Sequence, residues 1–197
     1  MGRHYRGVVT ALVCIATVGA WRPLAQPLKL APESKLWFDG KSTVRDWSCK
    51  APVMQAEVEA AGAGAQSQVL AGEKAVTSAK FVVPTMQLDC DNRTMNGHMR
   101  KALQADKNQE IAFTLTSYEL SKNGGVKGTL QGDLLINGVT KPITLPVEFA
   151  TGPNGALRMT GKYPLKMTDW KVTPPKLMLG TLKVNEMVTV SFDLLLQ

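Results

Sequence analysis

The pair Asn137-Gly138 constrains the fold of this chain most, because it separates two runs of alternating apolar and polar residues. Leu130 and Leu134 share one face of the run before the pair, and Ile143 begins the matching face of the run after it. An Asn-Gly pair between such runs predicts a β-hairpin with a type I′ turn, since both turn residues need a positive φ. The sequence therefore predicts a hairpin with one apolar face, which borders either a packed core or a cavity.

Short runs of the same alternation continue from about residue 36 to the end of the chain. A first hairpin is expected over residues 36–49, with its turn at Asp39-Gly40, and the last strand over 187–197. The Gly-, Ala-, Gln- and Ser-rich segment 61–68 lacks any other turn chemistry, so we expect a loop or a long hairpin tip there. Many short strands with regular turn signals predict an all-β domain, either a sandwich or an up-and-down barrel that closes on itself.

A single helix is predicted near residues 94–106. Met95, Met99 and Leu103 recur at positions i, i+4 and i+8, which places them on one helical face. Thr94 or Asp91 is expected to cap the start of this helix.

The first 20 residues are typical of a signal peptide. Arg3 and Arg6 precede an apolar stretch, residues 7–20, that is too short to span a bilayer comfortably and ends in small residues. We expect cleavage after Ala20 and a periplasmic or secreted mature protein. A lipidated Cys14 and a buried N-terminal helix are the alternatives.

Two cysteines, Cys49 and Cys90, remain after removal of the signal peptide. In an oxidising compartment an even pair predicts a disulfide, and closing a loop of about 40 residues would constrain the unfolded chain by about 4 kcal/mol. Two free thiols are the alternative.

The net charge of +7 falls to +5, from 21 basic and 16 acidic residues, once Arg3 and Arg6 leave. This charge is compatible with transient contact with an anionic membrane surface, but the lysines are scattered, as on an ordinary solvated surface.

Catalytic, metal-binding and nucleic-acid-binding patterns are missing from the expected mature sequence. Its one histidine, His98, has no neighbouring cluster with metal-ligand or triad spacing and is expected on the helix surface. Aromatic residues are 6% of the chain and do not alternate with basic ones, so a nucleic-acid platform is not expected. We predict a protein without enzymatic activity, resident cofactor, metal ion or nucleic-acid partner.

Glycines interrupt the apolar faces of the expected strands. Gly128 and Gly132 are in register with Leu130, and Gly161 is in register with Met159. A glycine leaves space above a strand, which favours a cavity, whereas glycines at barrel corners fit a filled core equally well.

Three motifs in one order resemble the YceI-like family. They are Gly-Val-Thr-Lys-Pro at 138–142, Thr-Asp-Trp at 168–170, and Val-Thr-Val-Ser-Phe at 188–192. Ile111 and Phe113 also match that family's strand after the helix, and the resemblance covers residues 34–197.

This resemblance implies a periplasmic or secreted lipid-binding domain. The implied fold is an extended, eight-stranded, lipocalin-like antiparallel barrel with one short helix and an elongated apolar pore. The implied ligand is a long-chain lipid: a polyisoprenoid, an isoprenoid quinone or an acyl chain. Many members carry a histidine early in the first hairpin, where this chain has Gly-Lys-Ser-Thr at 40–43, so a polar contact from that position is not expected here.

Residues on the inward faces are expected to line the pore. They are Phe81, Val83, Phe113, Leu115, Leu130, Leu134, Ile143, Leu145, Phe149, Met159 and Phe192. Trp170 is expected to pack in the core, with Asp169 capping a turn or anchoring a polar group at the pore mouth.

Two rival functions stay open: an envelope stress or interaction protein with a filled core, and a thiol or quinone redox partner based on Cys49 and Cys90. The oligomeric state also stays open, with a homodimer among the possibilities.

Overall fold

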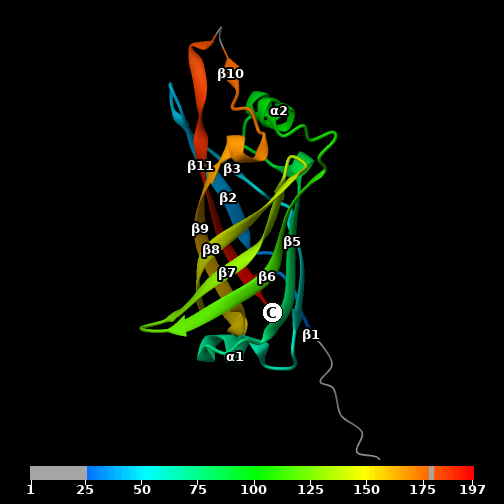
Figure 1. Ribbon diagram of the computed structural model, residues 1–197, viewed down its shortest axis with the longest axis vertical. Coiled ribbons are helices and arrows are strands. Elements are labelled where there is room, and N and C mark those ends of the chain that lie inside the picture. The colour runs from blue at the N-terminus through cyan, green and yellow to red at the C-terminus, as the bar shows by residue number, and fades with distance from the viewer. Residues whose placement is uncertain (1–25, 178–179) are drawn as a thin grey trace, which may run out of the picture.

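A computed structural model describes residues 26–177 and 180–197. The expected signal peptide, residues 1–20, lies outside these ranges. The described chain is mostly β-structure, which confirms the predicted class (Figure 1). The strands are β1 (Gln26–Leu28), β2 (Lys35–Ser42), β3 (Asp46–Lys50), β4 (Gln55–Ala60), β5 (Val76–Pro84), β6 (Glu110–Lys122), β7 (Val126–Ile136), β8 (Val139–Thr151), β9 (Leu157–Lys166), β10 (Lys176–Leu177) and β11 (Leu182–Leu196). The helices are α1 (Ala65–Ala71) and α2 (Arg93–Ala102), with short 3-10 turns η1 (Thr85–Gln87), η2 (Pro153–Gly155) and η3 (Met167–Trp170).

Ten strands form one curled antiparallel sheet in the order β1-β4-β5-β6-β7-β8-β9-β11-β2-β3, and β10 pairs with β11. The expectation of an eight-stranded barrel was therefore wrong. The outer strands, β1 and β3, are not joined by a continuous ladder. Instead one bridge ties the segment after β1 to β11, between Leu30 and Leu196, and another ties β3 to the segment after η1, between Lys50 and Asp89.

The disulfide between Cys49 and Cys90 lies beside the second tie and confirms the predicted pair. It joins the end of β3 to the segment between η1 and α2. Lys50 adds an ion pair with Asp91 at 2.7 Å on the surface of the same seam. The cross-link therefore holds one edge of the sheet to the rest of the wall.

The hairpin at Asn137-Gly138 is confirmed. It joins β7 to β8, with φ of 50° at Asn137 and 73° at Gly138. The Asn137 side chain is buried, donates to the carbonyls of Trp170 and Lys171, and accepts a 2.8 Å hydrogen bond from Asn108. One turn residue thus holds three chain segments together.

The first hairpin turns later than the sequence indicated. Asp39-Gly40 lies inside β2, and the chain reverses after Ser42, so the expected turn at residues 39–40 was wrong. Gly40 is required by packing instead of by a turn. A Cβ at Gly40 would lie 2.1 Å from the indole ring of Trp47, which covers it from β3.

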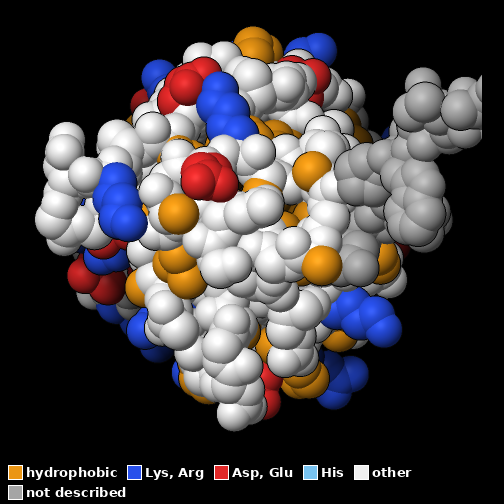
Figure 2. Space-filling view, turned by 90° about the horizontal axis from the view of Figure 1, so that it is seen from below, with side chains coloured by type: hydrophobic (Ala, Val, Ile, Leu, Met, Phe, Trp, Pro, Cys, Tyr) orange, Lys and Arg blue, Asp and Glu red, His pale blue; other side chains and the backbone are white. Residues whose placement is uncertain are grey.

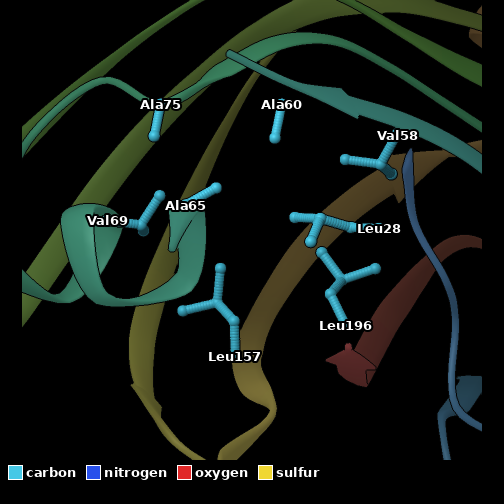
Figure 3. Close-up of a cluster of buried hydrophobic side chains, with 8 residues drawn as sticks. All are labelled: Leu28, Val58, Ala60, Ala65, Val69, Ala75, Leu157 and Leu196. Carbon is cyan, nitrogen blue, oxygen red and sulfur yellow. The ribbon is translucent and has the colours of Figure 1, made fainter. Parts of the chain in front are cut away.

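Helix α1 occupies part of the segment expected to be a loop, so the prediction of a single helix was also wrong. Gly64 and Gly72 bracket the helix with positive φ, and between them Ala65 and Val69 are one turn apart and buried. These two side chains pack with Leu157 and other residues from β1, β4, β9 and β11 (Figure 3). This closed cluster fills the α1 end of the sheet. Seen from that end, the surface carries small apolar groups scattered among polar ones (Figure 2).

Helix α2 confirms the predicted helix and lies at the other end of the molecule (Figure 1). Its cap is Asn92, whose side chain accepts a hydrogen bond from the Met95 amide, and not Thr94 or Asp91.

Candidate functional site

An apolar cavity of about 530 Å³ lies inside the curled sheet, toward the end covered by α2. This volume is within the range of about 300–1,000 Å³ that is typical of small-molecule sites. Its wall runs along β11 from Leu182 to Leu194, a stretch of about 40 Å at the usual rise per residue. The interior of the sheet is therefore filled near α1 and hollow nearer α2.

The cavity opens at the α2 end. Its exposed lining residues, Arg45, Asn92 and Thr94, all lie there, in the β2–β3 turn and at the start of α2. Deeper lining residues such as Leu130 and Met159 are buried. A long molecule would consequently enter from the α2 end and extend toward the α1 cluster.

Aromatic rings cover glycines on the cavity wall. An added Cβ would lie 2.5 Å from the Phe113 ring at Gly132 and 2.4 Å from the Phe192 ring at Gly161. The space left by these glycines is therefore already occupied by rings from the neighbouring strands. Because these rings pack against the wall next to them, their close contacts do not depend on the opposite side of the sheet.

Nine of the eleven residues predicted to line a pore border this cavity. They are Phe81, Val83, Phe113, Leu130, Leu134, Ile143, Leu145, Met159 and Phe192. The other two, Leu115 and Phe149, are outside the lining. Leu115 pairs with Gly132, where the Phe113 ring covers the wall, and a bulge follows it. Phe149 lies over Gly128, between the α1 cluster and the next cluster of buried residues.

Residues that the predicted lining omitted come from several elements, among them α2, the first hairpin and β11. Helix α2 contributes Met95, His98 and Met99, and the first hairpin contributes Phe38 and Trp47. The spacing of Met95 and Met99 indicated an inward face of α2, but nothing in the sequence placed that face over a cavity. Because the turn was expected at residues 39–40, the sequence did not indicate that side chains of the first hairpin line the cavity.

Tyr163 adds a phenol side chain to this mainly apolar wall. Burial, and secondarily the nearby Asp169 carboxylate, raises the pKa of the Tyr163 hydroxyl above its ordinary value of 10.0, so the phenol is protonated well into the alkaline range. It can donate a hydrogen bond to a ligand. Trp170 is buried as expected, and its indole nitrogen donates to the Leu134 carbonyl at 3.0 Å.

Both disulfide sulfurs belong to buried residues of the cavity wall, with Cys49 3% and Cys90 6% exposed. In the ranges that the structure describes, no three or more His, Cys, Asp or Glu residues lie together in a way that could hold a metal ion. Within the same ranges, no helix has the length and hydropathy needed to cross a bilayer. The arrangement suits the burial of an apolar molecule.

Comparison with known proteins gives a family match and several structural matches. The model of the YceI-like domain family matches residues 34–196. Over 103 residues the chain is 35% identical to a UPF0312 protein of Vibrio vulnificus strain YJ016, a stretch that is 50% of this chain and 54% of that protein. The chain thus spans about half the length of the curated relatives that it matches.

Two solved structures share the fold. BcnA of Burkholderia cenocepacia superposes with a TM-score of 0.65 at 19% identity, over 83% of this chain and 96% of that chain. A polyisoprenoid binding domain from Saccharophagus degradans, implicated in plant cell wall breakdown, superposes with a TM-score of 0.59 at 17% identity, over 86% and 97% of the two chains. At these identities the likeness shows the fold alone.

Proposed function

The chain belongs to the YceI-like domain family, and on that premise we propose that it is an exported, non-enzymatic protein that holds a long-chain lipid in its apolar cavity. The match confirms the family that the three sequence motifs indicated. The ligand class is a polyisoprenoid, an isoprenoid quinone or a fatty-acyl chain. Its place of action is the periplasm or the outside of the cell.

One observation carries the proposal: a cavity of about 530 Å³ whose wall is almost entirely apolar. A polar molecule in such a cavity would lose the hydrogen bonds that its polar groups make with water, whereas a hydrocarbon tail has no such hydrogen bonds to lose. The name of the Saccharophagus degradans domain, which shares the fold, agrees with a polyisoprenoid ligand.

The same features weigh against the two rival functions. A filled-core interaction protein needs no cavity. A thiol redox partner needs accessible cysteines of low pKa, whereas Cys49 and Cys90 are bonded to each other and buried. The disulfide fits a structural staple beside the cavity.

Mass spectrometry of an organic extract of the purified protein tests the proposal directly, because a bound lipid would co-purify. The protein is then emptied and titrated with a series of alkyl chains of increasing length. Each buried methylene contributes about 0.8 kcal/mol, so affinity should rise about fourfold per carbon. It should stop rising when the tail reaches the cluster at α1.

Two adjacent residues of β8 provide a matched pair of variants. Leu145 is buried and lines the cavity, whereas Thr144 is exposed on the other face of the same strand. Leu145→Trp places bulk in the cavity and should weaken binding of a long chain at least tenfold, while Thr144→Trp should leave it unchanged. No extractable lipid, together with no binding at any chain length, would refute the proposed function.

A further inference from the structure

We propose that the mouth of the cavity binds an anionic head group, a carboxylate or a phosphate, through Arg45 and His98, while the attached chain occupies the apolar interior. This inference rests on the proposed function and specifies the chemical class of its ligand. Arg45 lies in the turn between β2 and β3, and His98 lies on α2. Both elements are at the end of the molecule that also carries β10 (Figure 1).

The charges that line the cavity are of one sign. Apart from Tyr163 and Trp47, whose indole nitrogen is buried, the polar side chains of the lining are Ser42, Arg45, Asn92, Thr94 and His98, which lie at the mouth. Among the described residues, no aspartate, glutamate or lysine belongs to the lining. The mouth therefore offers a guanidinium, an imidazole and neutral hydrogen-bonding groups, with no carboxylate to oppose an anion.

The Arg45 side chain has no partner within the described ranges. Its backbone is fixed, because Ser42 Oγ donates to the Arg45 carbonyl at 2.8 Å and accepts from the Arg45 amide at 3.1 Å. The nearest acidic neighbour in sequence, Asp46, lines a hollow on the outer face of the sheet together with Lys41. The turn thus holds Arg45 in place without using its guanidinium, which can form two parallel hydrogen bonds to a carboxylate or phosphate.

His98 faces the cavity from α2. It lies one turn from Met95 and Ala102 on the helical face that lines the cavity, and its imidazole has no hydrogen-bond partner among the described residues. An imidazole donates a hydrogen bond in either protonation state, so it can bind an anion whether charged or neutral.

The two ends of the cavity differ, which fixes the direction of the ligand. At the deep end Leu157, Val58 and Val69 are almost completely buried and form part of the α1 cluster. A charged head group placed against this cluster would be unpaired and strongly disfavoured. The only arrangement that pairs the charge puts the tail inward and the head group between α2 and the β2–β3 turn.

Binding of four probes that share a dodecyl chain tests this inference on the mature protein at neutral pH. The probes are dodecanoate, dodecyl phosphate, dodecanol and dodecylamine, measured by displacement of a neutral fluorescent long-chain probe. The two anionic probes should bind about tenfold more tightly than the alcohol, because each gains charge-assisted hydrogen bonds. The amine should bind no better than the alcohol. The stronger of the two anions identifies the head group as carboxylate or phosphate.

Variants at the mouth should remove only the preference for anions. In Arg45→Gln/His98→Gln the anionic probes should weaken about tenfold, and the alcohol should change less than twofold. Arg93→Gln is the matched control, because Arg93 is exposed on the same helix but does not line the cavity. The alcohol also reports whether each variant is folded.

The outcomes separate this inference from the proposed function. Equal binding of alcohol and anions by the unaltered protein would refute the head-group site and leave lipid binding intact. An anion preference that survives in the double variant would also refute it. Failure of all four probes to bind would overturn the proposed function and this inference together.

Discussion

Gly161→Ala tests the packing of rings on glycines that keeps the cavity open. Phe192 lies directly opposite Gly161 in the pairing of β11 with β9. A Cβ at Gly161 would lie 2.4 Å from the tip of the Phe192 ring and 2.9 Å from the Pro146 carbonyl oxygen. Since the backbone of β8 blocks one side, the ring can relieve the clash only by moving into the cavity.

The expected cost follows from this geometry. The ring must move by about 1 Å or more to restore an ordinary contact distance, and such overpacking typically costs about 1–3 kcal/mol. Replacing glycine within a strand returns about 0.5–1 kcal/mol of backbone entropy. Gly161→Ala should therefore lower the free energy of unfolding by about 1–2 kcal/mol, which is about 2–8 °C in Tm for a domain of this size. It should also weaken binding of a long-chain probe, because the ring narrows the cavity.

Thermal unfolding and probe titration of the variant measure both effects. Gly97→Ala is the matched control: a Cβ there meets nothing within 4 Å, and the residue lies inside α2. This change should raise stability by about 0.5–1 kcal/mol and leave binding unchanged. If Gly161→Ala were as stable as the unaltered protein and bound the probe equally well, the account of the cavity wall would be wrong.

Three further changes test the elements that support the cavity. Replacing both Cys49 and Cys90 by alanine should lower stability by about 4 kcal/mol, since the cross-link closes a loop with a sequence separation of 41; urea unfolding measures this, and reduction of the unaltered protein should reproduce the loss. Asn137→Gly keeps the positive φ of the turn but removes the hydrogen bonds of a buried side chain, so it should lower stability by about 2 kcal/mol, or about 4–8 °C in Tm. An unchanged Tm would show that these hydrogen bonds do not stabilise the fold. Asp193→Asn removes the pair with Arg158, which holds the pKa of the Asp193 carboxyl below its ordinary value of 3.8. Because that pKa is lowered in the folded state, the pair stabilises the fold above pH 3.8, and its contribution is lost as the pH falls further. The variant should therefore be about 0.5–1 kcal/mol less stable than the unaltered protein at neutral pH and equally stable in acid. Unfolding measurements at both pH values test the sign of this effect.

Local signals in the sequence predicted the elements that depend on local chemistry. The Asn137-Gly138 turn follows from the positive φ that both residues need, and α2 follows from the spacing of Met95, Met99 and Leu103. Alternation alone also placed nine of the eleven named residues in the cavity wall. Period-two patterns carry this information because adjacent side chains of a strand point to opposite faces.

The errors came from residues whose role depends on distant parts of the chain. Gly40 has the sequence context of a turn, but it is fixed by the Trp47 ring on the neighbouring strand. Ala65 and Val69 lie in a segment with no strong pattern, and α1 forms where it can cover the open end of the sheet. The strand number and the two tied edges also depend on contacts between segments far apart in sequence, such as Leu30 with Leu196.

The cavity stays open because side chains of its wall pack against neighbouring strands, whereas the α1 cluster packs across one end of the sheet. Rings over Gly40, Gly132 and Gly161 give the inward aromatic side chains close contacts without drawing opposite strands together. The α1 cluster closes one end, and the ties at Leu30–Leu196 and Cys49–Cys90 hold the edges. A lipid would thus enter a space that already exists, and little binding energy would be spent on ordering the wall. Reduction of the disulfide should then weaken lipid binding even though it removes no residue from the lining, because each ligand must order the freed edge again.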